Sequence, residues 1–110
     1  MAEVFRRVQY LLTANSSLDA VYTTPTLTTT ILMNAHVANK DLTEPADLTA
    51  ILQGYQSSNT YLARNITIPV GSALNFLSGK VVMQGNDSIR VGASANSYLD
   101  LTLSLLEITS

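Results

Sequence analysis

Apolar and polar residues alternate with a period of two along most of the chain, which predicts β-strands. The clearest case is segment 98–108. Its apolar face carries Leu99, Leu101, Leu103 and Leu105, and its polar face carries Asp100, Thr102 and Ser104. The longest candidate, 27–38, also alternates and contains the run Thr28-Thr29-Thr30, whose β-branched side chains disfavour a helix.

Shorter alternating segments, separated by turn residues, fill the rest of the chain. They cover residues 4–13, 20–24, 47–53, 59–68, 72–77, 80–83 and 88–93. A helical turn over 47–55, started by Pro45 and Asp47, is the one alternative to a strand. Gly85-Asn86-Asp87 separates two apolar runs and predicts a hairpin. The pattern predicts an all-β fold, a single antiparallel β-sandwich or jelly roll of about eight short strands, with residues 1–110 as one domain.

The composition limits the partners of such a domain. Charged residues make up 13% of the chain and hydrophobic residues 46%, with a net charge of -2. The few basic residues are scattered, so they supply no positive field for nucleic acid or for an anionic membrane, and we expect neither as a partner. The N-terminal segment has no signal-peptide core, and we expect synthesis in the cytosol of the cell that makes the chain. With no cysteine, disulfides and thiolate metal sites are excluded.

Residues with catalytic or metal-binding chemistry are sparse. His36 is the only histidine and lies in a predicted strand, without a nucleophile motif nearby. Asp41, Glu44 and Asp47 supply oxygen ligands of the kind that Ca²⁺ prefers, but their spacing matches no EF-hand loop. We interpret this segment as a solvated acidic loop and leave a bound ion open. We expect no enzyme activity, no catalytic residue, no cofactor and no metal site.

Some apolar residues fall on positions that the alternation assigns to the outside. Burial by a second subunit would account for them, and so would cover from within the domain. Tyr55 lies near the tip of a predicted turn, where an interface contact or packing is a simpler role than sugar stacking. Arg6 and Arg7 belong to segment 1–13, an N-terminal strand or arm that we expect to contact a partner. The predicted interface residues are Arg6, Arg7, Leu32, Ile51, Tyr55, Leu106 and Ile108.

Several segments together resemble small β-sandwich virion proteins of tailed bacteriophages, particularly of phages that infect aquatic bacteria. The similar region runs from about residue 21 to 108 and is carried by the order and spacing of short motifs. These motifs are Val21-Tyr22-Thr23-Thr24-Pro25, Thr28-Thr29-Thr30-Ile31, Val37-Ala38-Asn39, Ile68-Pro69-Val70-Gly71-Ser72, Leu77-Ser78-Gly79-Lys80, Gly85-Asn86-Asp87-Ser88-Ile89-Arg90-Val91 and Leu99-Asp100-Leu101-Thr102-Leu103-Ser104-Leu105-Leu106-Glu107-Ile108.

The resemblance implies a structural role in the virion, self-association and no catalysis. Within that role we expect a capsid decoration (cement) protein that contacts major capsid or other virion proteins as a homo-oligomer, with a trimer favoured. Such a protein is made in the cytoplasm of the host bacterium and resides in the virion. A neck, tail or fibre-base protein, or a receptor- or glycan-binding module, remains the alternative.

Overall fold

The computed structural model describes residues 2–12, 18–56, 58–77, 79–95 and 98–109. Within them the backbone forms nine strands and no helix, and therefore no helix that could cross a bilayer. The strands are β1 (Ala2–Leu11), β2 (Asp19–Thr23), β3 (Thr28–Asn39), β4 (Ala46–Gln53), β5 (Asn59–Ile68), β6 (Ala73–Asn75), β7 (Val81–Met83), β8 (Ser88–Ala93) and β9 (Leu99–Thr109). Each strand coincides with one of the alternating segments, and residues 46–53 form β4 where a helical turn was the alternative. Asn15-Ser16-Ser17, a run of polar residues that predicts a turn, lies outside the described residues.

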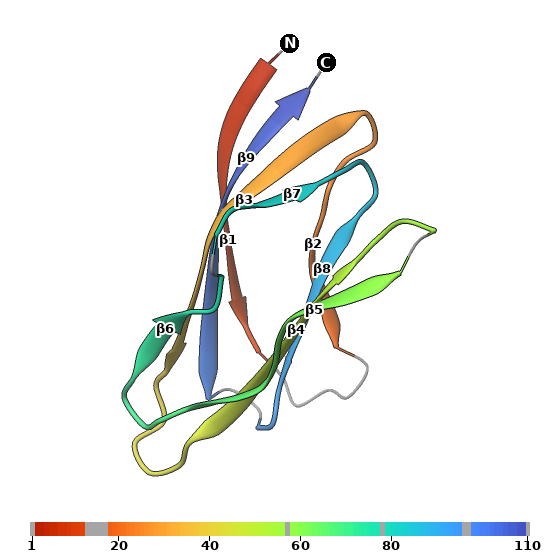
Figure 1. The fold of residues 1–110 in the computed structure, drawn as a ribbon. Helices are drawn as coiled ribbons and strands as arrows, with labels where there is room; N and C mark the ends of the chain where they lie inside the picture. The colour runs from red at the N-terminus through yellow and green to blue at the C-terminus, as the bar shows by residue number, and fades with distance from the viewer. Residues whose placement is uncertain (1, 13–17, 57, 78, 96–97, 110) are drawn as a thin grey trace.

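The strands form two antiparallel sheets that pack face to face (Figure 1). The first sheet has the order β1-β9-β3, and both β6 and β7 pair with the remaining side of β3. The second sheet has the order β2-β8-β4-β5. The two ends of the chain lie side by side because Ala2 of β1 pairs with Thr109 of β9.

The strand pairs are nested along the chain. The antiparallel pairs are β1 with β9, β2 with β8, β3 with β6 and β7, and β4 with β5. A long antiparallel ribbon folded over into two sheets produces this pattern, which is the jelly-roll arrangement. The prediction of an antiparallel β-sandwich or jelly roll is therefore confirmed. On the side of β3 away from β9, two short strands, β6 and β7, take the place of one longer strand.

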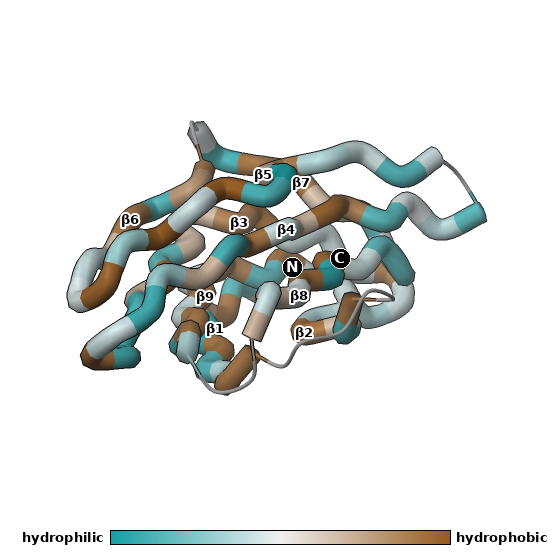
Figure 2. The backbone as a smooth tube through the Cα atoms, turned by 90° about the horizontal axis from the view of Figure 1, so that it is seen from below, coloured by the Kyte–Doolittle hydropathy of each residue, from teal (hydrophilic) through white to brown (hydrophobic). Residues whose placement is uncertain are grey.

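The hydrophobic core lies between the sheets and is built by the inward positions of the alternating strands. Hydrophobic and hydrophilic positions alternate along the tube in Figure 2. The largest fully buried side chains are Leu12, Leu32, Leu48, Ile68, Met83, Ile89, Leu99, Leu101, Leu103, Leu105, Val37 and Val91. Burying each of these side chains contributes about 1.5–3 kcal/mol to folding, so their burial is the main interaction that holds the two sheets together.

A β-bulge in the middle of β3 changes which of its residues face the core. The pairing with β9 skips from Leu32 to Asn34 and leaves Met33 as the extra residue. The buried positions are Thr28, Thr30 and Leu32 before the bulge and Ala35, Val37 and Asn39 after it. The prediction that Leu32 faces outward is therefore wrong, because its side chain is 0% exposed. A bulge inserts one residue, so a uniform period of two assigns half of the strand to the wrong face.

The turn at 84–87 carries the chain from one sheet to the other, and the predicted hairpin is wrong. β7 before it pairs with β3 of the first sheet, whereas β8 after it pairs with β4 and β2 of the second. The local turn chemistry is as expected: Asn86 has a φ of 70°, and the amide of Asp87 donates to the carbonyl of Gln84 at 3.0 Å. The turn residues determine a chain reversal, and the core determines which sheet the next strand joins.

Candidate assembly interface

The C-terminal strand presents two apolar side chains on the outer face of the first sheet. Its inward residues are the buried leucines of the core and Glu107, and the pattern continues without a register shift to the end of β9. Leu106 and Ile108 therefore face outward, as predicted, and each is half-buried by its neighbours on the sheet. Their role in an interface stays a prediction.

Strand register places Leu106 in a line of apolar side chains that crosses the first sheet. Leu106 is opposite Phe5 of β1 on one side and Ile31 of β3 on the other, and Ile31 is in turn opposite Val82 of β7. We call Phe5, Leu106, Ile31 and Val82 the apolar row. Neighbouring strands lie about 4.8 Å apart, so the row is continuous across the sheet. Phe5 is 73% exposed and Val82 58% exposed, so both ends of the row are open to solvent.

Three members of the apolar row were missed from the sequence. Phe5 has the opposite parity to the apolar positions Val8 and Tyr10 of β1, which pack against the core. A large aromatic residue on the polar parity of a strand is the signal that identifies it. Uniform alternation assigned Ile31 to the inner face because it does not account for the bulge. Val82 lies in an all-apolar strand, where alternation does not distinguish the two faces.

The predicted interface residues on the second sheet do not join this surface. Ile51 faces outward from β4 and is half-buried between Arg90 of β8 and Tyr61 of β5. Tyr55 lies in the β4–β5 turn, is 56% exposed, and its amide donates to the carboxylate of Asp87 at 2.9 Å. Ile51 and Tyr55 thus lie on the second sheet, and of the predicted residues Leu106 alone belongs to the apolar row.

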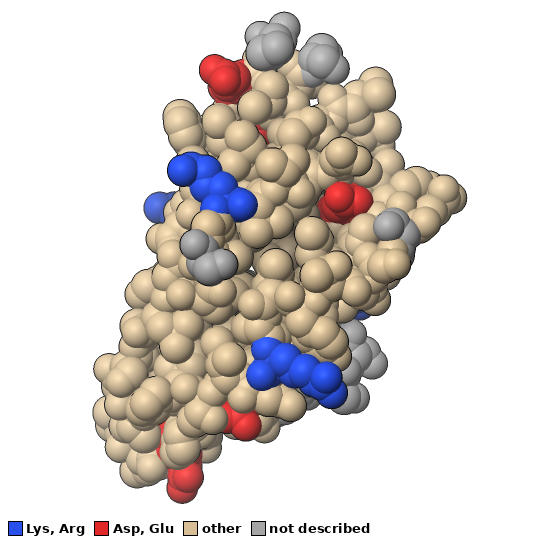
Figure 3. Space-filling view, in the orientation of Figure 1, with Lys and Arg blue, Asp and Glu red and all other residues tan. Residues whose placement is uncertain are grey.

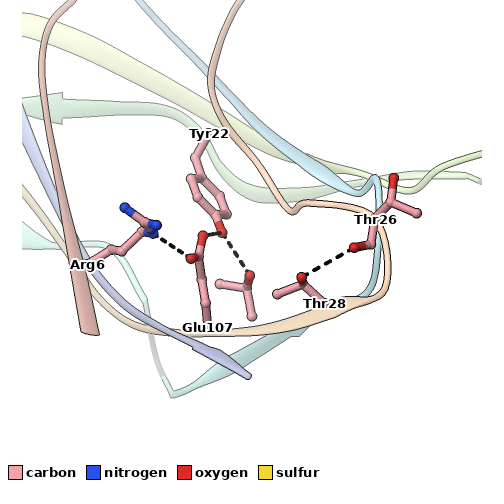
Figure 4. A network of polar contacts seen from close by, with 6 residues as sticks. Arg6, Tyr22, Thr26, Thr28 and Glu107 are labelled. Atoms are coloured by element: carbon pink, nitrogen blue, oxygen red, sulfur yellow. Dashed lines mark hydrogen bonds and ion pairs between the residues drawn. The ribbon is translucent and has the colours of Figure 1, made fainter. Parts of the chain in front are cut away.

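Arg6 takes part in a polar network inside its own chain (Figure 4). Its Nε donates to the carboxylate of Glu107, which sits at an inward position of β9 and is 7% exposed. The hydroxyl of Tyr22, from β2 of the other sheet, donates to the same carboxylate and lies 2.9 Å from the hydroxyl of Thr30. The network therefore links three strands of the first sheet to one of the second. Arg6 thus pairs with Glu107 of its own chain, and its side chain is 57% exposed, so its predicted partner contact stays a prediction.

The network shifts the pKa values of its acidic members in opposite directions. Burial raises the pKa of Tyr22 to about 12, with a further contribution from the hydrogen bond to Glu107. Burial also acts to raise the pKa of Glu107, but the hydrogen bonds from Tyr22 and Arg6 and the charge of Arg6 outweigh it, and the pKa lies below its ordinary value. Glu107 is therefore a carboxylate held charged near the core by two donors.

Arg7 and Glu3 lie on the outer face of β1, on either side of Phe5. Arg7 is exposed, and among the described residues no carboxylate forms an ion pair with it. The predicted partner contact of Arg7 stays a prediction. Charged side chains are sparse on the face of the molecule in Figure 3. The small charged fraction of the chain therefore leaves broad uncharged areas on that face.

Two carboxylates of the predicted acidic loop, those of Asp41 and Asp47, accept hydrogen bonds within the chain. Asp41 accepts hydrogen bonds from the amides of Thr43 at 3.0 Å and Glu44 at 2.7 Å, and these bonds lower its pKa. Asp47 accepts from the hydroxyl of Thr67 at 2.7 Å. Among the described residues no three His, Cys, Asp or Glu side chains converge in a way that could hold a metal ion.

An open depression on the described part of the surface carries no set of converging reactive groups. It is lined by Gln9, Tyr10, Leu11, Asp100, Leu101 and Thr102. Asp100 is its only carboxylate, and it pairs with Lys40 at 3.1 Å. His36 is exposed on β3, opposite Thr102 and Asn75, and is not part of the lining. We therefore regard the apolar row as the candidate functional surface.

Comparisons with known proteins identify the fold and no family. Neither the models of protein families nor the curated protein sequences contain a match to the chain. A solved structure of Bacillus endospore appendages, described as disulfide-linked pili, is similar with a TM-score of 0.57 and 11% identity over 99% of this chain and 88% of that chain. A chain of the T13 IBDV viral particle is similar with a TM-score of 0.54 and 9% identity over 97% of this chain and 31% of that chain.

These similarities show a shared β-sandwich architecture. This chain spans less than a third of the IBDV chain, so it corresponds to one part of that larger protein. The endospore pili are described as disulfide-linked. This chain has no cysteine, so it cannot form such links.

Proposed function

We propose that this protein is a non-enzymatic structural component of a virion that works by binding neighbouring subunits through the outer face of its first sheet. The observation that carries the proposal is the apolar row, in which Phe5 and Val82 are open to solvent and Leu106 and Ile31 are half-buried. An exposed apolar surface of this kind is stabilised when a partner covers it. The jelly-roll fold, which viral capsid domains often use, supports the same role.

The specific role that we propose is that of a capsid decoration protein in a tailed phage. The resemblance of residues 21–108 to small phage virion proteins supports it, as does the low charge of the surface. Such a protein stabilises a head by adding buried apolar area across major capsid subunits. Full burial of an exposed Leu, Ile or Val contributes roughly 1.5–3 kcal/mol, so a side chain that is already half-buried gains about half of that, and repetition over many copies makes the sum large.

The test compares wild-type protein with the Leu106→Glu variant on virions. Wild-type protein is expected in hundreds of copies per particle, whereas the variant folds but occupies at least about tenfold fewer sites, because a charge replaces the centre of the apolar row. Quantitative mass spectrometry of purified particles gives the copy number, and circular dichroism checks the fold. Full occupancy of the particle by the variant would show that the apolar row is not part of the interface. Tens of copies or fewer would place the protein in the neck or tail.

A subunit of a surface appendage is a second candidate, favoured by one observation. The endospore pilus structure is matched over 88% of its own length, so that whole subunit has the same architecture as this chain. Electron microscopy of the purified protein separates the two roles. Filaments formed by the protein alone support the appendage, whereas discrete oligomers that bind only in the presence of capsid support the virion.

A glycan-binding role is the remaining alternative, and the exposed tyrosines of the second sheet are its basis. Tyr55 and Tyr61 are both more than half exposed. The guanidinium of Arg64, however, lies 5.1 Å from the centre of the Tyr61 ring and occupies one of its faces. A sugar needs such a face for stacking, so this arrangement weakens the case. Retention of the protein on a glycan array, lost on Tyr55→Ala substitution, would reverse that judgement.

A further inference from the structure

β1 is a long edge strand with an unusually regular backbone. Its pairing with β9 runs from Ala2 to Leu11 without a register shift, and no described strand pairs with its other side. The other edges differ: β6 and β7 have 3 residues each, β5 is interrupted by register shifts and has Asn65 at a φ of 50°, and β2 is short and also shifted. Bulges and short strands protect sheet edges against pairing with another chain. β1 lacks both protections, and its residues 2–7 are exposed on both faces.

We propose that β1 pairs in antiparallel fashion with β1 of a second copy of this chain, with Phe5 opposite Phe5 at a two-fold axis. The first sheets of the two copies then merge into one continuous sheet. The inference rests on the proposed function only in requiring self-association, and it holds for any particle in which the protein occurs.

Symmetry limits the registers that such a pair can adopt. A two-fold axis perpendicular to the sheet places outer face beside outer face, so outward residues of one copy must lie opposite outward residues of the other. The outward residues at the exposed end of β1 are Glu3, Phe5 and Arg7. Only registers that pair members of this set with one another keep the two outer faces continuous.

Charge complementarity selects one of the remaining registers. When Phe5 lies opposite Phe5, Glu3 lies opposite Arg7 of the second copy, and symmetry forms this pair twice. The other registers do not pair these opposite charges. The two neighbouring registers place Glu3 opposite Phe5 or Arg6 opposite Arg6, and the next two place Glu3 opposite Glu3 or Arg7 opposite Arg7. Like charges directly opposite each other are destabilising. Within one copy Glu3 and Arg7 are about 13 Å apart along the strand and cannot neutralise each other.

The same register joins the apolar rows of the two copies. Phe5 is the β1 end of the apolar row, and its side chain is the most exposed of the four. Pairing at Phe5 places two aromatic rings side by side and continues the row from one copy into the next. The pattern of β1 thus matches a second β1 in backbone, charge and hydrophobic contact, which identifies another copy of this chain as the occupant of the edge.

Cysteine substitution tests the register directly because the chain has no cysteine of its own. Directly opposite residues have Cα atoms about 4.5–5.5 Å apart, within disulfide range. The Phe5→Cys variant is therefore expected to form a disulfide-linked dimer on mild oxidation. The control, Glu3→Cys, is not, because its two copies lie about 13 Å apart in this register. A mixture of Glu3→Cys and Arg7→Cys chains should give the mixed dimer. A Phe5→Cys yield no higher than that of Glu3→Cys overturns the proposal.

Charge reversal provides a second test that leaves Phe5 in place. Glu3→Arg and Arg7→Glu are each expected to raise the dissociation constant of the dimer about tenfold, since each creates two like-charge pairs. An equimolar mixture of the two variants restores dimerisation, because every pair in the mixed dimer is again complementary. Sedimentation velocity measures all three samples. If the mixture associates no better than either variant alone, the register is wrong.

The two proposals can fail separately. If the cysteine and charge tests fail while Leu106→Glu still lowers occupancy on virions, β1 pairing is overturned and the proposed function stands. If the tests succeed but the protein is absent from virions, the dimer stands and the virion role falls.

Discussion

The two outer faces of the sandwich have similar strands but opposite side-chain chemistry. On the second sheet, polar side chains bond to one another across neighbouring strands. These pairs are Asp47 with Thr67 at 2.7 Å, Thr49 with Asn65 at 3.1 Å, and Arg90 with Gln53 at 3.2 Å. On the first sheet, the central positions belong to the apolar row, whose four members come from four adjacent strands.

The difference shows where the capacity for assembly lies. A face of mutually bonded polar groups is satisfied in water and gains little from a partner. An apolar face gains free energy in proportion to the area that a partner covers. With few charged residues, the two sheets thus differ in what they present to solvent. The outer face of the second sheet carries polar side chains that bond to one another, whereas the outer face of the first sheet leaves apolar side chains exposed. Four predictions test this contrast, from the largest expected effect to the smallest.

The largest effect is expected from one substitution made on both faces. Ile31 and Ile51 are both half-buried isoleucines that face outward from central strands. Ile31→Glu is expected to weaken assembly about 10- to 100-fold, because it places a charge in the apolar row. Ile51→Glu is expected to change it by less than about threefold. Sedimentation velocity and particle occupancy measure the difference. Equal losses would mean that both faces are interfaces, as the predicted role of Ile51 requires.

The second prediction concerns the link between the sheets at Glu107. Tyr22→Phe removes the hydroxyl that donates to the buried Glu107 carboxylate and contacts Thr30. The loss is expected to be about 1–3 kcal/mol of unfolding free energy, since a buried charged acceptor loses a partner. Tyr61→Phe, on the exposed side of the second sheet, serves as the control and should cost less than about 0.5 kcal/mol. Urea denaturation measures both, and equal losses would show that the buried link adds nothing.

The third prediction is the pH dependence that this network imposes. The folded-state pKa of Glu107 lies below the ordinary value of 4.5, so its contribution is complete above that pH and is lost as the pH falls through the folded-state pKa. The pKa of Tyr22 is raised from 10.0 to about 12, so its contribution is complete below pH 10 and is lost as the pH rises towards 12. Tyr22→Phe should flatten the alkaline limb of the stability profile and Glu107→Gln the acid limb. Unchanged limbs in these variants would assign the pH dependence to other groups.

The smallest effect is expected on the polar face. Thr67→Val keeps the shape of the side chain but removes its hydrogen bond to Asp47. Because the bond is exposed, water replaces it, and the unfolding free energy should fall by no more than about 0.5–1 kcal/mol. Assembly should not change at all. A clear loss of assembly in this variant would show that the second sheet also carries a partner.

Local patterns in the sequence were sufficient to predict where the strands lie and which residues of β9 face inward or outward. Strand β9 is regular from Leu99 to Thr109, so alternation alone placed Leu103 inside and Leu106 outside. The period of two follows from the geometry of the extended chain and needs no tertiary contact. The absence of long helical periods likewise determined the fold class.

The tertiary structure alone decided how these strands share a surface. The bulge at Met33 moved Leu32 into the core and Ile31 to the outside, and the turn at Asn86 proved to join two sheets. The apolar row exists only because strand register brings Phe5, Leu106 and Ile31 from distant parts of the chain into one line. Alternation is a property of one strand, whereas register and sheet choice depend on which long-range pairing buries the most apolar area, and no local pattern encodes that competition.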